Sequence, residues 1–162
     1  MSRSHRRLAE LEALYRRRFA AFARVAVSIT GSAELGRDAV QEGFARAIEQ
    51  RDQFRGDCPL EAWVWRIIVN AARTAASRAA HDTSEGSTEA AAATNGDHQL
   101  TEVELWVRTL PERQRLVVFL RYWADLDYRS IARALEIEVG TVSATLSSAH
   151  ETLRRAVQEV PK

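Results

Sequence analysis

Histidines and cysteines carry much of the catalytic and metal chemistry of proteins, and in this chain they form no cluster. His5, His81, His98 and His150 are scattered, and none lies four residues from another histidine or from a cysteine. Metal sites need such ligands at short, regular spacings. The single cysteine, Cys58, has no histidine near it in the sequence, so we expect an ordinary thiol. We therefore expect no catalysis, no metal and no other cofactor.

Hydroxyl side chains gather in a segment with the pattern of a helix-turn-helix. Residues 127–135 have the apolar periodicity of a short helix. Residues 136–140 are expected to form a turn, and residues 141–146 to begin another helix. Ala132 is small enough for the two helices to cross closely. Such a motif places the N-terminal part of its second helix in the major groove of DNA. The candidates for contact with bases or phosphates are Thr141, Ser143, Ala144, Thr145, Ser148 and, further along, Arg154.

The turn of this motif carries an unusual residue. Glu136 stands where a helix-turn-helix commonly has glycine. If Glu136 must adopt a left-handed backbone conformation, the cost is about 1–2 kcal/mol.

Three amphipathic helices with short connections are predicted for the first half of the chain, and they should form a compact bundle. Apolar residues recur at intervals of three and four from Leu8 to Ile29. Ser32 is suited to cap a second helix, whose inward face includes Ile48. Pro59 suits the first position of a third helix, which should run to about residue 80.

Two groups of residues in these helices allow more than one interpretation. On the third helix, periodicity places Trp63, Val64, Ile67 and Ile68 in the core, whereas Trp65 fits either core or surface. The arginine run at residues 16–18 is expected to be a solvated face rather than a nucleic-acid contact.

The middle of the chain separates two domains. Residues 81–100 contain no large apolar side chain before Leu100, so they cannot bury enough surface to offset the entropy of ordering them. The charge divides in the same way: residues 1–80 carry fourteen basic and nine acidic residues, 81–104 none and six, and 105–162 nine and seven. We predict a domain at 1–80, a flexible acidic linker at 81–100 and a second domain at 101–162, in an all-α fold.

The second domain is predicted to begin with a short helix at about residues 101–109, after which Pro111 opens another. No apolar run reaches the ~18–20 residues of a membrane span, and no apolar stretch follows the basic start. A cytoplasmic protein without a membrane span is expected.

Two sets of motifs resemble the extracytoplasmic-function (ECF) class of bacterial RNA polymerase sigma factors. Residues 35–47, LGRDAVQEGFARA, are similar to that family's second conserved region, followed by FRGD at 54–57, Trp63 and RIIVN at 66–70. LPERQR at 110–115 and the helix-turn-helix are similar to its fourth region. Motifs of both regions occur in the family order, on either side of the predicted linker.

The resemblance implies a role for each group of residues. The polar face of the second helix would dock on the clamp of core RNA polymerase through Asp38, Gln41, Glu42 and Arg46. The −10 promoter element would be read and opened by Gln53, Phe54, Arg55, Arg66, Asn70 and Arg73. The helix-turn-helix candidates named above would read the −35 element. The implied partners are core polymerase, through its β′ clamp and β flap, promoter DNA and an anti-sigma factor.

Two other interpretations remain open. A stand-alone helix-turn-helix regulator would bind operators without polymerase and would give the second helix no role. A degenerate sigma-like protein would hold polymerase without reading −35 DNA. The degenerate interpretation is supported by the composition of the last helix. Where the family usually has several Lys or Arg residues, this helix has Ser143, Thr145, Ser148 and His150. Each lost phosphate contact weakens DNA binding.

Overall fold

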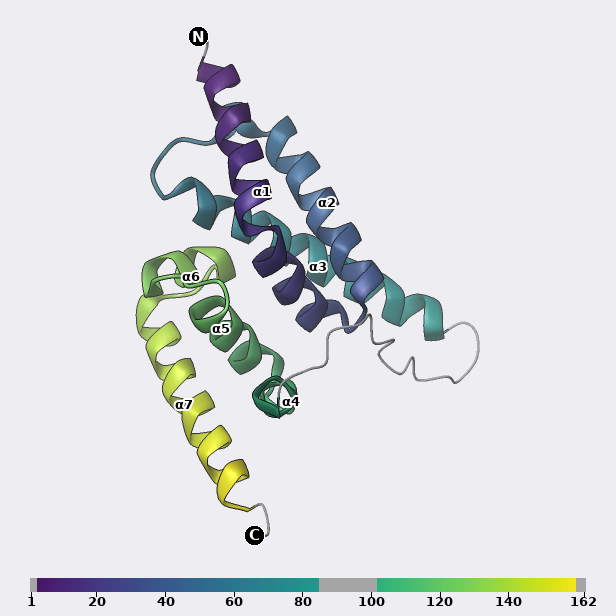
Figure 1. Ribbon diagram of the computed structural model, residues 1–162, viewed down its shortest axis with the longest axis vertical. Coiled ribbons are helices and arrows are strands. Elements are labelled where there is room, and N and C mark those ends of the chain that lie inside the picture. Colours follow the sequence, from purple (N-terminus) through teal and green to yellow (C-terminus); the bar gives the residue numbers. More distant parts are fainter. Residues whose placement is uncertain (1–2, 85–101, 160–162) are drawn as a thin grey trace.

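The protein is all-helical in the residues that the computed structural model describes, 3–84 and 102–159 (Figure 1). The elements are α1 (Arg3–Thr30), α2 (Ala33–Glu49), the 3-10 turn η1 (Arg51–Gln53), α3 (Leu60–Ser84), α4 (Glu102–Arg108), α5 (Glu112–Tyr122), α6 (Tyr128–Leu135) and α7 (Val139–Gln158). They form two helical units, α1–α3 and α4–α7, which confirms the predicted fold class. Because α3 continues to Ser84, residues 81–84 of the predicted linker are helical; the rest of that prediction lies outside the described residues.

The first unit is built on an antiparallel pair, α1 and α2, with α3 crossing both (Figure 1). Ser32 caps α2 as predicted, because its hydroxyl accepts a hydrogen bond from the Leu35 amide at 3.3 Å. Two glycines allow the close approach of α2 to its neighbours. A Cβ at Gly36 would lie 2.6 Å from the side chain of Val27, and one at Gly43 would lie 2.7 Å from that of Ile68. Both glycines are therefore packing residues.

Aromatic rings fill the centre of this unit. Trp65 is fully buried, 4.2 Å from Phe22 between ring centroids, so the open choice for this tryptophan resolves to core. Phe22 also packs edge-on against Phe44 at 5.2 Å. At the rim, Leu8 and Ile48 are 39% and 37% exposed. Their predicted inward positions were wrong, because both side chains are exposed where the start of α1 meets the end of α2.

The second unit contains the predicted helix-turn-helix, formed by α6 and α7. Asp127 caps α6, since its carboxylate accepts a hydrogen bond from the Ser130 amide at 2.7 Å. Glu136 ends α6 in the left-handed conformation, with φ 55° and ψ 46°. Glu136 therefore adopts the left-handed conformation for which the sequence predicts backbone strain. Helix α7 begins at Val139, two residues earlier than expected.

Both predicted helix-opening prolines lie one residue outside their helices. Pro59 precedes α3 and Pro111 precedes α5. Each proline carbonyl accepts the first hydrogen bond of its helix, from Trp63 at 3.2 Å and from Arg115 at 2.9 Å. Each proline therefore occupies the N-cap position, and its missing amide leaves no donor unsatisfied.

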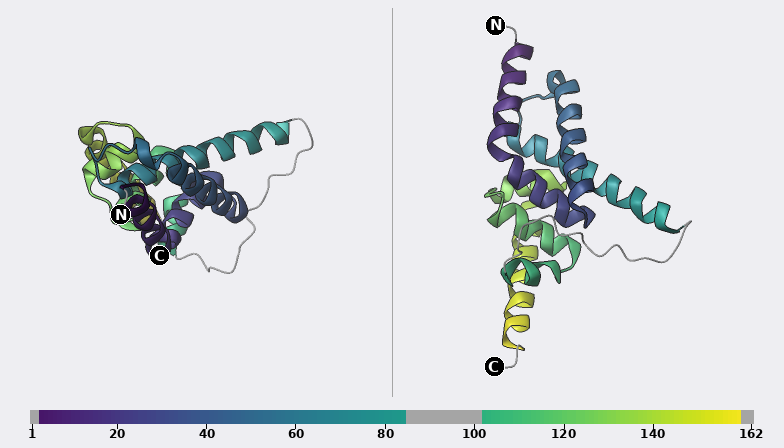
Figure 2. Two further views of the ribbon diagram at one scale, coloured as in Figure 1. Left: turned by 90° about the horizontal axis from the view of Figure 1, so that it is seen from above. Right: turned by 45° about the vertical axis from the view of Figure 1, so that its right-hand side comes forward.

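The two units pack against each other, with α6 on α3 and α5 on α1 (Figure 2). Helix α3 also buries Ala62, Val69 and Ala72, which lie outside its single predicted apolar face. Arg18 joins the units, because its guanidinium pairs with Glu61 of α3 at 2.9 Å and donates to the Ala124 carbonyl. The prediction that residues 16–18 form only a solvated face was therefore wrong for Arg18.

Candidate functional site

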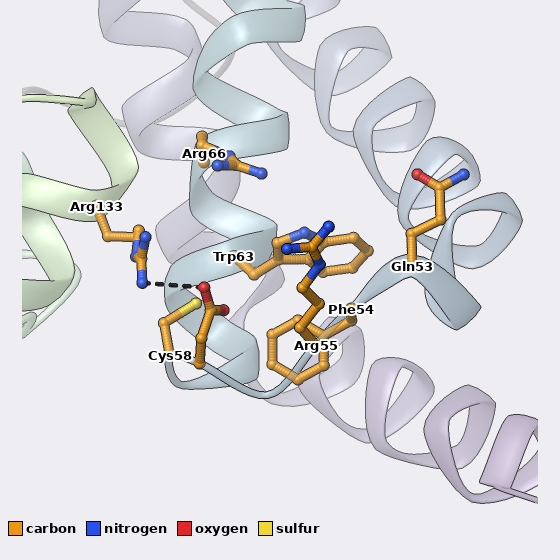
Figure 3. A pocket seen from close by; sticks show the side chains of 8 residues that line it. Gln53, Phe54, Arg55, Cys58, Trp63, Arg66 and Arg133 are labelled. Carbon is orange, nitrogen blue, oxygen red and sulfur yellow. Dashed lines mark hydrogen bonds and ion pairs between the residues drawn. The ribbon is translucent and has the colours of Figure 1, made fainter.

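A pocket of about 230 Å³ lies where the loop between η1 and α3 meets α6 (Figure 3). Its lining is basic and aromatic, and one of its arginines comes from the second unit. The lining residues are Gln53, Phe54, Arg55, Asp57, Cys58, Trp63, Arg66 and Arg133. The structure thus brings together four of the six residues that the sequence assigns to −10 DNA: Gln53, Phe54, Arg55 and Arg66.

The loop reaches this shape through one glycine and one ring contact. Gly56 has φ 79°, a left-handed conformation that a residue with a Cβ rarely adopts. Phe54 packs on Trp63 with 5.3 Å between ring centroids, which fixes the loop to the first turn of α3. Trp63 was predicted to be core and is 8% exposed, yet its ring also lines the pocket. A tryptophan at the end of a core stripe can serve both purposes.

Charge in the pocket is unevenly balanced. Arg133 of α6 pairs with Asp57 at 3.4 Å, whereas Arg55 and Arg66 have no ion-pair partner within the described residues. Unpaired guanidinium groups beside aromatic rings are suited to phosphates and stacked bases. Burial raises the pKa of the Cys58 thiol despite the opposing charge of Arg133. Cys58 is therefore held as a neutral thiol, in agreement with the expectation from the sequence.

The other two −10 candidates lie further along α3 and outside the pocket. Asn70 is exposed. Arg73 is also exposed, and its Nε lies 3.5 Å from a carboxylate oxygen of Glu112 at the start of α5. Arg73 is thus already engaged by the second unit. Its availability to DNA depends on breaking that contact.

The polymerase-binding candidates share one exposed face of α2. Asp38, Gln41 and Glu42 are exposed, and Arg46 is half-buried and pairs with Glu42 one turn away. None of these side chains contributes to the core of the first unit. The face is therefore free to meet another molecule.

The −35 candidates on α7 differ in their exposure and in whether they bond within the protein, and Ser148 is both exposed and bonded. Ser143, Ala144 and Arg154 are exposed. Thr145 is half-buried and donates its hydroxyl proton to the Thr141 carbonyl at 2.7 Å. Ser148 accepts a hydrogen bond from Gln114 of α5 at 3.0 Å. Two of the six candidate side chains are thus hydrogen-bonded within the protein, and Thr141 is also half-buried.

Some of the polar side chains that lie near these sites were not identified from the sequence. Arg129 and Arg133 line a second pocket beside Arg66, on the exposed side of α6. Their four-residue spacing on a short helix was the available signal. On α7, His150 Nε2 lies 2.8 Å from the Tyr122 hydroxyl. That contact joins residues far apart in the sequence and had no local signal.

No helix among the described residues is both long enough and apolar enough to cross a membrane. No group of three potential ligands for a metal ion occurs in that part of the chain either.

The comparisons with known proteins agree in both halves. The family model of sigma-70 region 2 matches residues 14–81, and that of sigma-70 region 4 matches residues 100–160. The RNA polymerase sigma-H factor of Pseudomonas aeruginosa is 30% identical over 151 residues, which cover 82% of this chain and 78% of that protein. The ECF RNA polymerase sigma-E factor of Escherichia coli is 29% identical over 139 residues, covering 75% and 73%.

A solved structure shares the fold. It is that of the sigma factor RpoE in complex with the anti-sigma factor NepR from Bartonella quintana, with a TM-score of 0.72, 20% identity, and coverage of 94% of this chain and 99% of that one. The sequence matches identify the family, and the structural match extends over both helical units. The chain therefore belongs to the ECF sigma factors and directs RNA polymerase in promoter-specific initiation of transcription.

Proposed function

We propose that the two halves of this sigma factor divide promoter recognition between them, with boundaries near residues 80 and 101. The first half binds core polymerase through the exposed face of α2 and takes an unpaired −10 base into the pocket between η1 and α3. The second half contacts the −35 element through α7 and the β flap of polymerase. The protein itself is non-catalytic and acts in the cytoplasm.

One observation carries the −10 assignment. Arg55 and Arg66 project into a pocket with Phe54 and Trp63 and, within the described residues, have no carboxylate partner. A single-stranded element needs an aromatic surface for its bases and cations for its phosphates. The loop supplies both within one pocket.

The contact between the two halves must open on a promoter. The centres of the −10 and −35 elements are about 25 base pairs apart, or about 85 Å at 3.4 Å per base pair. Arg133 of the helix-turn-helix instead lies 3.4 Å from Asp57 in the loop between η1 and α3, which we call the −10 loop. The two surfaces therefore have to separate before both elements are bound together.

Run-off transcription with core polymerase tests the assignment. We expect specific transcripts with the full chain, and loss of most of them when residues 105–162 are deleted. Transcripts that persist after this deletion would favour the degenerate interpretation, in which −35 reading is dispensable. Specific operator binding without polymerase would favour the stand-alone regulator.

The degenerate interpretation has one structural observation in its favour. Thr145 and Ser148 of α7 use their hydroxyls within the protein.

An anti-sigma factor is a further proposed partner, because the structural relative RpoE is in complex with one. Co-purification from the native host with an affinity-tagged chain tests that partner.

A further inference from the structure

The N-terminal turns of α1 reach the −10 loop although they lie outside the matched family region. Helix α1 begins at Arg3, whereas the region 2 match begins at residue 14. The Ser4 hydroxyl accepts a hydrogen bond from Nε of Arg51, in η1, at 2.9 Å. The start of α1 thus contacts the element that leads into the pocket.

Arg7 makes the second contact, and it is with the loop itself. Its guanidinium carbon lies 4.4 Å from the centroid of the Phe54 ring. A guanidinium over an aromatic face is attracted by the negative potential of the ring. Phe54 in turn packs on Trp63. Two contacts, one from α1 and one from α3, therefore hold this ring.

The remaining surroundings of Arg7 argue against a direct contact with DNA. Its side chain is 20% exposed, and its Nη1 lies 3.0 Å from a carboxylate oxygen of Glu10. Arg7 does not line the pocket, unlike Arg55 and Arg66. Its guanidinium is oriented by Glu10 toward the ring of Phe54, with little surface left for a phosphate.

We propose that Arg7 is a positioning residue for promoter opening. It holds Phe54 against Trp63, which keeps the loop in the shape that leaves the pocket open to an unpaired base. This inference rests on the proposed −10 role of the pocket. Without Arg7, the loop samples other shapes, and capture of the base becomes less frequent.

The test compares Arg7→Ala with Arg6→Ala in the holoenzyme. Both variants lose one positive charge from the same turn of α1. Arg6 is exposed and forms no ion pair within the described part of the chain, so it is a matched control. Initiation is measured on an intact promoter and on promoters with an abasic site at each non-template −10 position in turn. Thermal melting and core-polymerase affinity show that each variant folds and assembles.

The expected result is specific to one base. Arg7→Ala should initiate about five- to tenfold more slowly than the wild type on the intact promoter. The two proteins should be equal on the abasic promoter that most impairs the wild type, because that DNA has no base to capture. Arg6→Ala should match the wild type on both templates. Arg7→Lys, which keeps a cation but not a planar group, should fall between them.

Two results would overturn the inference. The first is that Arg7→Ala behaves as Arg6→Ala does. The second is that Arg7→Ala is slowed by the same factor on every template, as a general structural defect would be. Arg66→Ala separates these from failure of the proposed site. If Arg66→Ala shows the base-specific loss and Arg7→Ala does not, only the positioning role is wrong. If neither variant and no abasic site has an effect, the pocket assignment fails and the role of Arg7 fails with it.

Discussion

The two surfaces proposed to bind DNA differ in how their polar groups are used. In the pocket of the first half, Arg55 and Arg66 are without ion-pair partners in the described residues, beside the rings of Phe54 and Trp63. On α7, Thr145 and Ser148 hydrogen-bond within the protein. Cations available to phosphates dominate affinity for nucleic acid, whereas hydroxyls contribute modestly. We therefore propose that the pocket of the first half contributes more to promoter binding than the hydroxyl groups of α7 do.

The largest expected effect comes from substituting one residue on each surface. Arg66→Ala should slow initiation about 10- to 50-fold, since base and phosphate contacts in a single-strand site are worth ~1–3 kcal/mol. Ser143→Ala on α7 should change the rate less than threefold. Arg78→Ala is the matched control for Arg66, because Arg78 is exposed on the same helix and forms no ion pair in the described region. Initiation is followed by run-off transcription.

Equal losses in Arg66→Ala and Ser143→Ala would remove the proposed difference between the surfaces. The salt dependence gives an independent check. If Arg66 contacts a phosphate, its loss reduces the slope of log K against log salt by about 0.7 for single-stranded DNA. Ser143→Ala should leave that slope unchanged.

Helices α2 and α7 also differ in how tightly their glycines are enclosed. Gly43→Ala would place a Cβ 2.7 Å from the side chain and 3.2 Å from the backbone of Ile68, so α2 and α3 must move apart. We expect a loss of about 1–3 kcal/mol in the free energy of unfolding, as for other overpacked cores. Gly140→Ala on α7 meets nothing within 4 Å and should stabilise the protein by about 0.5–1 kcal/mol. Urea unfolding measures both.

A smaller change on Gly43→Ala than on Gly140→Ala, or a change of the same sign, would show that α2 and α3 adjust freely. The −10 pocket provides a second readout. Because Ile68 lies on the helix that carries Arg66, a displaced α3 should also slow initiation by Gly43→Ala. Gly140→Ala should leave the −10 pocket unchanged and should therefore not slow initiation by way of that pocket.

Local features of both halves could be predicted from the sequence, whereas contacts between helices distant in the sequence could not. The cap at Ser32 was predicted from a short-range rule, and the position of Glu136 in the turn identified where strain could occur. The cap at Asp127 was not predicted, although the helix was expected to begin there. Arg18 and Trp65 were assigned wrongly or left open. Their partners belong to other helices, and for Arg18 one partner is the Ala124 carbonyl, 106 residues away.

The site shows the same division. Four −10 candidates meet in one pocket because they lie on a loop and the adjoining turn of one helix, which the motif specifies. Arg133 was missed because only the packing of α6 on α3 brings it to the pocket. Gly36 and Gly43 stood inside a recognised motif, yet their packing role depends on Val27 and Ile68 of other helices.

The caps of the two halves respond differently to acid. Hydrogen bonds from Ser130 lower the pKa of Asp127 below its ordinary value of 3.8. A lowered pKa in the folded state means that the stabilisation is complete at neutral pH and is lost as the pH falls below about 4. An exposed cap is worth about 0.5–1 kcal/mol. Ser32, the cap of α2, has no charge to lose.

Asp127→Asn keeps a capping oxygen without a titrating group. We expect the wild type to lose about 0.5–1 kcal/mol more than Asp127→Asn as the pH falls from 6 to 2, measured by urea unfolding at each pH. Ser32→Ala should lower stability by the same amount at both pH values. Parallel pH curves for the wild type and Asp127→Asn would show that Asp127 does not distinguish the second half.

The smallest expected effect concerns the contact between the halves. Arg73 of the first half is paired with Glu112 of the second, and both side chains are well exposed. Exposed pairs contribute about 0–1 kcal/mol, so Glu112→Gln should raise the affinity of the free protein for a single-stranded −10 oligonucleotide only about twofold. Glu12→Gln removes a carboxylate from the exposed Arg16 pair on α1 and controls for net charge.

Fluorescence anisotropy at low salt measures this difference, and raising the salt concentration should abolish it by screening the pair. If Glu12→Gln also raises the affinity for the oligonucleotide twofold, the effect is explained by the change in net charge alone. A gain confined to Glu112→Gln would show that the second half holds a DNA-binding cation of the first. In that case, DNA binding by the first half would be coupled to the separation of the halves, because that separation frees Arg73 from Glu112.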